Sequence, residues 1–294
     1  VKELERKNYI GGAAIVASHI KALGAKCEFI SVIGNDSSAK IVKNLLDRMD
    51  IKSDLIIDST RPTTFKKRYV VENQKLFRVS RLEDHSLDPK IEKRLISILK
   101  KKAKEVDGIV ISDFVYGVIT EKILQEIIKL SHRYGLLLFG DLQCSSQVGS
   151  VTKFKNFSLI TPNEREARIA LQDKDSGLEL LSNKLISLTN SERLIMKLGA
   201  NGFIAYDRNQ EGNLLTQSFP ALSVNPVDVS GAGDSLLAVM ATGLSSNQSM
   251  MATSALGCLI ASLAVESMGN IPISNDSLVK AVEDTFEQSN NFQN

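Results

Sequence analysis

The sequence has 294 residues, of which 43% are hydrophobic and 24% are charged, and its formal net charge is +2. This size and balance predict one large globular domain, and the small charge gives no electrostatic case for nucleic acid or a membrane surface. The three cysteines, Cys27, Cys144 and Cys258, have neither zinc-site spacing nor the pattern of a disulfide framework. No apolar run reaches the ~18 residues of a membrane span, and the charged segment 1–9 has no signal-peptide pattern, so we expect a cytoplasmic protein.

Apolar, β-branched runs alternate with amphipathic helical patterns along the chain. Helices are predicted at 13–23, 39–49, 88–103, 120–134 and 164–171, and strands at 27–33, 108–112, 136–140 and 157–161. Uniformly apolar strands that alternate with helices are typical of a parallel sheet covered on both faces. We therefore predict an α/β domain over residues 1–294, with a three-layer Rossmann-like parallel sheet and helices on both faces.

Residues 53–82 depart from this alternation, because strand-like segments follow one another there without a helix. Lys66, Arg68 and Arg78 alternate with apolar positions, which predicts a small antiparallel flap with one polar face. Such a flap could act as a lid that excludes water from a reaction site. A solvent-facing meander without a ligand would give the same pattern.

The most informative segment is Asp228-Val-Ser-Gly-Ala-Gly-Asp234, which precedes a stretch of small and apolar residues at 235–244. A glycine turn at a helix N-terminus binds anions, because unpaired N–H groups and the positive end of the helix dipole point at the ligand. Asp234 at its rim suits proton removal from a hydroxyl while Gly231, Ala232 and Gly233 hold charge on a transferring phosphoryl group. An ordinary capped turn is the alternative.

Two further motifs each have a second interpretation. Gly11-Gly12 opens the first helix, where it allows either close approach to a small ligand or a tight entry turn. Asn163 and Glu166 lie three apart at a helix start, so they could reach metal-bound water or phosphate, or serve as an N-cap and a surface side chain.

Two other features point to the same end of the predicted sheet. Asp113 and Asp141 lie at the carboxyl ends of predicted parallel strands, which is the side where open sheets bind ligands. The segment 197–202 follows another apolar run and could be a hairpin turn with no further role.

Together and in this order, these motifs resemble the ribokinase-like (PfkB-type) carbohydrate kinase family. The resemblance covers roughly residues 9–275, and the motif at 228–234 is its most specific element. Within the family, the segments 11–14, 61–64 and 112–117 look like the heptose-7-phosphate kinase branch, found in bifunctional heptose kinase/adenylyltransferases.

The resemblance implies ATP-dependent phosphorylation of a hydroxyl on a sugar or sugar phosphate, including one similar to heptose 7-phosphate. It implies that Asp234 is the base and that the backbone of 230–233 forms the anion hole. Asn163 and Glu166 match the pair that organises Mg²⁺, and Asp228 matches a place where some members hold a monovalent cation such as K⁺.

The implied nucleotide-binding residues also include Lys197, Gly199, Gly202, Ser230 and Cys258. The implied sugar-side residues are Gly11, Gly12, Lys66, Arg68, Arg78, Asp113 and Asp141. Members often pair through the flap, which implies a homodimer.

The chain also departs from the family pattern, mostly on the sugar side. Ile15 replaces an Asn, Tyr116 and Gln143 each replace a Lys, and Cys258 replaces an Asn. The family begins with a strand whose Asp grips sugar hydroxyls, and with ten residues before Gly11 we expect that strand to be absent. We also expect no adenylyltransferase module.

The phosphoryl-transfer residues are thus present, while the identity of the sugar stays open. A sugar- or nucleotide-binding module of the same fold, with weak or no turnover, is the alternative function. A nicotinamide-dependent dehydrogenase is disfavoured, because no Gly-x-Gly-x-x-Gly follows the first predicted strand.

Overall fold

The computed structural model describes residues 4–71, 74–144, 147–209, 211–223, 226–269 and 271–291. Its helices are α1 Ala13–Ala22, α2 Ser37–Arg48, α3 Pro89–Lys102, α4 Glu121–Tyr134, α5 Glu164–Leu171, α6 Leu178–Thr189, α7 Ala232–Ser245, α8 Met250–Val265 and α9 Asn275–Asn291. Its strands are β1 Glu28–Ile33, β2 Lys52–Ile57, β3 Phe65–Val71, β4 Gln74–Arg81, β5 Gly108–Asp113, β6 Leu137–Leu142, β7 Leu159–Ile160, β8 Arg193–Lys197, β9 Phe203–Arg208 and β10 Leu214–Phe219. Within these ranges, no helix has the length and apolarity needed to cross a membrane.

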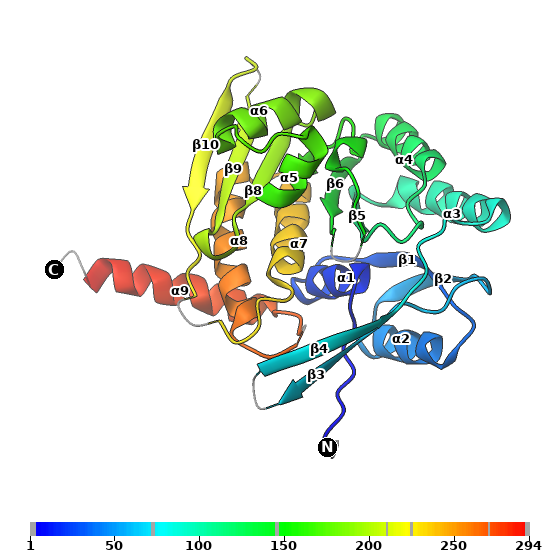
Figure 1. Ribbon diagram of the computed structural model, residues 1–294. Coiled ribbons are helices and arrows are strands. Elements are labelled where there is room, and N and C mark those ends of the chain that lie inside the picture. The colour runs from blue at the N-terminus through cyan, green and yellow to red at the C-terminus, as the bar shows by residue number, and fades with distance from the viewer. Residues whose placement is uncertain are drawn as a thin grey trace.

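The largest sheet has six strands in the order β10-β9-β8-β7-β6-β5. Strands β5 to β8 run parallel, whereas β9 and β10 are antiparallel to their neighbours. One apolar cluster packs α3, α4 and α6 against one face of the sheet, and a second packs α1, α7 and α8 against the other (Figure 1). This arrangement confirms the predicted α/β class with helices on both faces.

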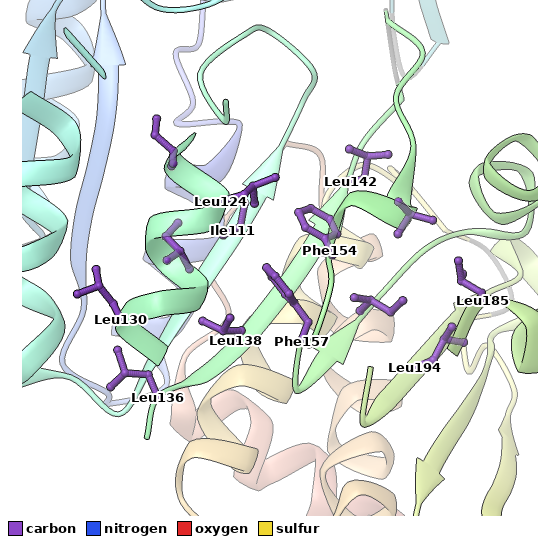
Figure 2. Packing of buried hydrophobic residues seen from close by; sticks show 14 of the residues in the cluster. Ile111, Leu124, Leu130, Leu136, Leu138, Leu142, Phe154, Phe157, Leu185 and Leu194 are labelled. Atoms are coloured by element: carbon purple, nitrogen blue, oxygen red, sulfur yellow. The ribbon is translucent and has the colours of Figure 1, made fainter. Parts of the chain in front are cut away.

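Local sequence determines where the helices begin and how the core closes. Thr120 and Asn163 cap α4 and α5 by accepting hydrogen bonds from backbone N–H groups of the first turn. Figure 2 shows Leu138 of β6 beside Phe157, and Leu130 of α4 and Phe154 belong to the same cluster.

Gly140 in the middle of β6 has a packing role. A Cβ atom at this position would lie 2.8 Å from the Phe154 ring, so only glycine lets that ring cover β6. The carboxyl end of β6, which carries Asp141, is therefore held firmly in the core.

Strands β1 and β2 form a separate two-stranded parallel sheet. All six residues of β1 are only half-buried although the strand is apolar, and β1 and β5 both line one cleft of about 2990 Å³. Among the described residues, no strand pairs with the second edge of β1 or of β5. The predicted strand at 27–33 thus forms, but outside the six-stranded sheet.

The flap is narrower than the range 53–82 expected from the sequence. β3 and β4 form an antiparallel hairpin, while residues 53–57 belong to β2 and pair in parallel with β1. The place of β2 is decided by its pairing with β1, which lies earlier in the chain, and a local sequence pattern does not encode such pairing. Residues 72 and 73, also in the expected flap, lie outside the described residues.

The base of the hairpin is fastened by a buried arginine that precedes β3. The Arg61 guanidinium donates to Asp58 Oδ2 at 2.9 Å, to the Tyr116 carbonyl at 2.8 Å and to the His85 carbonyl at 2.7 Å. His85 follows β4 and Tyr116 follows β5, so one side chain joins both ends of the flap to the loop beyond β5.

Candidate active site

The start of α7 is an open helix N-terminus. Gly231 is its N-cap with φ 97°, a left-handed conformation that favours glycine, and no side chain of the described residues caps the helix. The first-turn N–H groups of a helix lack intrahelical partners, and the helix dipole adds positive potential there. The residues of the predicted anion turn therefore stand at the start of a helix, with Asp234 in its first turn.

Asp234 is buried, with only 7% of its surface exposed, and charged groups surround it. Burial raises the pKa of its carboxyl to about 7, and the neighbouring Asp141 adds to the rise. A hydrogen bond from Gln143 and the charges of Lys197 and Lys66 act in the opposite direction. A carboxyl with this pKa is a competent general base near neutral pH.

Asp141 is fully buried on β6 and binds three side chains. Its Oδ1 accepts hydrogen bonds from Lys197 Nζ at 2.6 Å and Thr161 Oγ1 at 2.7 Å, and its Oδ2 accepts one from Gln143 Nε2 at 3.1 Å. A Cβ atom on Gly233 would lie 3.6 Å from Lys197 Nζ, so the lysine lies beside the turn. Burial alone would lower the pKa of Lys197, but Asp141 and Glu166 raise it on balance and keep the amine charged.

Asn163 and Glu166 form a capping box at the start of α5. Asn163 Oδ1 accepts from the Glu166 N–H at 2.8 Å, and Glu166 Oε2 accepts from the Asn163 N–H at 2.9 Å. Glu166 Oε1 also accepts from the Cys144 N–H at 3.2 Å, and burial raises the pKa of this carboxyl. The N-cap part of the alternative interpretation is thus correct, but Glu166 is buried and is not a surface side chain, and both residues line the cleft.

The donor set near α5 suits a metal that is held largely by a substrate. No group of three or more His, Cys, Asp or Glu residues that could hold a metal occurs in the part of the chain described. Mg²⁺ commonly keeps several waters and takes one or two carboxylates together with phosphate oxygens. Glu166 and Asn163 fit that mode, because their oxygens keep lone pairs beyond the bonds of the capping box.

The expected nucleotide residues beyond β8 cluster around the segment 219–221. Gly202 has φ 83°, and a Cβ there would lie 2.0 Å from the Phe219 carbonyl oxygen. Cys258 Sγ donates to the Pro220 carbonyl at 2.8 Å, and burial raises the pKa of this thiol. Gly199, with φ 61°, begins the same turn as Gly202.

The segment just before α7 is fixed to the end of α8. The Asp228 side chain accepts from the Ser230 N–H at 2.8 Å, and its own N–H donates to the Val265 carbonyl at 3.2 Å. Asp228 is buried while Ser230 is half-buried, and both line the cleft.

The expected sugar side is formed by α1, the end of β5 and the flap. Gly12, with φ 60°, is the N-cap of α1 and faces the Phe114 ring. Asp113 is buried, accepts from the Val115 N–H at 2.9 Å and forms an ion pair with Lys153. Lys66 reaches from β3 to lie 5.0 Å from the centroid of the Phe114 ring.

The cleft gathers most of the residues that the sequence predicted. Its lining includes Gly11, Gly12, Lys66, Arg68, Arg78, Asp113, Asn163, Glu166, Lys197, Asp228, Ser230, Gly231, Gly233 and Asp234. Gly199, Gly202, Ala232 and Cys258 do not line it, and Asp141 lies directly behind it through its bond to Lys197.

Sequence reasoning missed three polar side chains of this region. It gave no role to Gln143, Lys153 or Thr161. Gln143 binds both Asp234 and Asp141. Lys153 binds Asp113, and Thr161 binds Asp141. Their places just after strand ends were the available signal for Gln143 and Thr161. Lys153 lies in a short 3₁₀ turn, and no local pattern marked it.

Comparisons with known proteins identify the family to which the chain belongs. The sequence profile of the pfkB family carbohydrate kinases matches residues 1–277. The bifunctional protein HldE of Helicobacter acinonychis is 30% identical over 280 residues, which are 94% of this chain and 58% of HldE. The chain thus spans somewhat more than half the length of the curated relatives it matches.

Solved structures with the same fold have much lower sequence identity. Ribokinase from Thermotoga maritima superposes with TM-score 0.74 at 21% identity, covering 96% of this chain and 90% of that one. Phosphofructokinase-2 from Escherichia coli in complex with substrates and products superposes with TM-score 0.75 at 18% identity, covering 92% of this chain and 86% of that one. The same enzyme matches at 0.73 as a potassium complex and as a tetrameric inhibited form. The chain therefore belongs to the pfkB family of carbohydrate kinases, which phosphorylate a hydroxyl of a sugar or sugar phosphate at the expense of ATP.

Proposed function

We propose that Asp234 is the general base of this kinase and that the turn at 231–233 stabilises the transferring phosphoryl group. Asp234 takes the proton of the acceptor hydroxyl, whose oxygen bonds to the γ-phosphorus of ATP as the bond to the ADP oxygen breaks. The first-turn N–H groups of α7 and the Lys197 ammonium face the negative charge on the transferred group. The observation that carries this proposal is a buried carboxylate with a pKa near 7 beside an uncapped helix N-terminus.

We assign the remaining ligands of the reaction to residues of the cleft and of the 199–202 turn. Glu166 and Asn163 would hold Mg²⁺ through water, and the ion would neutralise phosphate charge. The turn at 199–202 and the segment 219–221 that Cys258 contacts would flank the nucleotide. Asp228 is our candidate ligand for a monovalent cation, since its buried carboxylate lies beside the turn and a phosphofructokinase-2 of the same fold is known with potassium.

We infer that the acceptor sugar carries a phosphate, as a heptose 7-phosphate does. Arg68 on β3 and Arg78 on β4 are direct cross-strand partners, and both line the cleft. Like charges opposite one another destabilise a hairpin, whereas a phosphate between two guanidinium groups would turn the repulsion into attraction. Gly11, Gly12 and Asp113 would then contact the sugar itself. Lys66 would contact the part of the substrate that lies between the flap and Asp234.

We further infer that two copies of the chain associate through the hairpin. Val71, Leu76, Phe77 and Val79 are each more than half exposed on β3 and β4. A two-stranded hairpin is marginally stable alone, and pairing would cover these side chains. Sedimentation analysis of a Phe77→Ser variant should give monomers where the parent gives dimers. We place the protein in the cytoplasm, where ATP is supplied and its three free thiols stay reduced.

A coupled ADP-release assay tests the proposed reaction. Sugars are offered in matched pairs, with and without a terminal phosphate, and ADP formation is compared between the parent protein and Asp234→Asn. We expect ADP release that depends on the phosphorylated sugar and is lost in the variant. ADP release by Asp234→Asn at the parent rate would contradict the role of the base, and equal use of both members of each pair would contradict the substrate class.

A further inference from the structure

Gln143 follows the end of β6 and lies between two carboxylates. Its Nε2 donates to Asp234 Oδ1 at 2.7 Å and to Asp141 Oδ2 at 3.1 Å. Since an ionised carboxylate only accepts hydrogen bonds, the amide must present its two N–H groups to this pair. The Gln143 backbone N–H also donates to the Asp113 carbonyl at 2.8 Å, so the residue is fixed at both its main chain and its side chain.

The charges that face Asp234 come from several elements. Asp141 from β6 repels it, while Lys197 from β8 and Lys66 from β3 attract it. Lys197 is hydrogen-bonded to Asp141, and the negative charges of Glu166 on α5 and of Asp234 also attract it. Its positive charge is therefore shared among three carboxylates. The hydrogen bond from Gln143 is made to Oδ1 of Asp234, so this amide does not engage the second oxygen, Oδ2.

We propose that Gln143 is a positioning residue, which holds Oδ1 of Asp234 so that Oδ2 is presented to the acceptor hydroxyl beside the 231–233 turn. This inference rests on the proposed function of Asp234 as the base. Two carboxylates placed so near each other would otherwise turn apart or share a proton. The amide bridges them without adding a charge, so it fixes the orientation of the base and favours its ionised form.

The neutral amide also sets how strong the base is. A lysine at this position would place a cation between the two carboxylates and lower the pKa of Asp234, which weakens it as a base. A glutamate would add a third negative charge and raise that pKa, so that Asp234 would be protonated at neutral pH. An apolar side chain would remove the hydrogen bonds to the ionised form and raise the pKa as well.

The test is a titration of Asp234 in the whole protein, followed by ¹³C NMR of carboxyl-labelled aspartate and assigned with Asp234→Asn. We expect Gln143→Lys to lower the titration midpoint by about one pH unit, and Gln143→Met and Gln143→Glu to raise it by about one pH unit or more. Gln125→Met is the matched control, because Gln125 is exposed on α4 and donates to Glu121 Oε1 at 3.1 Å, so it should leave the midpoint unchanged. Asp234 titration midpoints in all three Gln143 variants that equal the midpoint of the parent protein would overturn the proposal.

The pH dependence of kcat/KM provides a second, independent readout. Its acid limb should move together with the NMR midpoint in each variant, so that a midpoint displaced by about one pH unit changes the rate at a fixed low pH about tenfold. A rate that falls equally at every pH would indicate a merely structural role and overturn the proposal. If no sugar is phosphorylated at any pH, the proposed function fails, while the NMR titration still decides whether Gln143 holds Asp234.

Discussion

Lys197 Nζ, at the end of β8, lies 2.6 Å from Asp141 Oδ1 on β6, and this ion pair lies beside the turn that begins α7. Asp141 is fully buried and the Lys197 side chain is 17% exposed. The amine is also close to Gly233, so one cation both compensates a buried carboxylate and faces the candidate phosphoryl site.

Lys197→Met should therefore reduce both stability and activity. Removing one partner of a buried pair leaves Asp141 uncompensated, which costs about 3–5 kcal/mol in the free energy of unfolding. Asp141→Asn in the same chain should recover most of that loss but little of the activity, because the charge facing the phosphoryl group stays absent. Urea denaturation of both single variants and the double variant measures this coupling. A double variant as unstable as Lys197→Met would contradict it.

Asp234→Asn should greatly slow transfer while it stabilises the protein at high pH. The loss of a positioned base lowers kcat by about 10²–10⁴. The folded pKa of about 7 lies above the unfolded value of 3.8, so the folded state binds the extra proton between these values and the free energy of unfolding falls as pH rises from 3.8 to 7. The variant should be more stable than the parent at pH 8 by up to a few kcal/mol, with little difference at pH 4.

Nucleotide binding separates this outcome from general damage. Asp234→Asn should retain the affinity of the parent for an ATP analogue in calorimetry, since the turn and Lys197 are unchanged. Much weaker nucleotide binding, or lower stability than the parent at pH 8, would count against Asp234 as a buried base.

The paired arginines of the flap should govern the affinity for a phosphorylated acceptor. Arg78→Gln should raise KM for the phosphorylated sugar at least tenfold and leave kcat nearly unchanged, because a bidentate phosphate contact is worth about 1.5–3 kcal/mol. KM for ATP should not change. Arg133→Gln, at the exposed end of α4, is the control. An unchanged KM in Arg78→Gln would show that the phosphate of the sugar does not bind there.

The sequence predicted α1 to α5 and the α7 turn, because their signals are local, but it did not predict α6, α8 or α9. The Asn163 cap, the Gly231 turn and the apolar face of α4 are each encoded within a few residues. The division of the strands into three sheets was not predictable in this way. Whether β1 joins β2 alone or extends the larger sheet depends on contacts between segments far apart in the chain.

Within the site, the sequence indicated which residues carry chemistry but not how they are coupled. Asp141 and Gln143 are two apart on an apolar strand end, and nothing nearby shows that Asp234, 91 residues later, completes the group. The expectation by resemblance that Cys258 lies near the nucleotide did not include the contact of its thiol with the Pro220 carbonyl, outside the lining of the cleft. Such couplings arise only when helices and strands pack.

His19 in α1 should make folding sensitive to mild acid, independently of catalysis. It is buried, its Nδ1 accepts a hydrogen bond from the Ile273 N–H, and burial lowers its pKa from 6.5 to about 4. The unfolded chain therefore binds more protons between pH 6.5 and 4, and the stability contributed by neutral His19 is lost across that window, by about 3 kcal/mol. His19→Gln should flatten the pH dependence of the unfolding free energy there, whereas His132→Gln, on the exposed side of α4, should not. Parallel pH curves for the parent and His19→Gln would mean that His19 is already protonated in the folded protein.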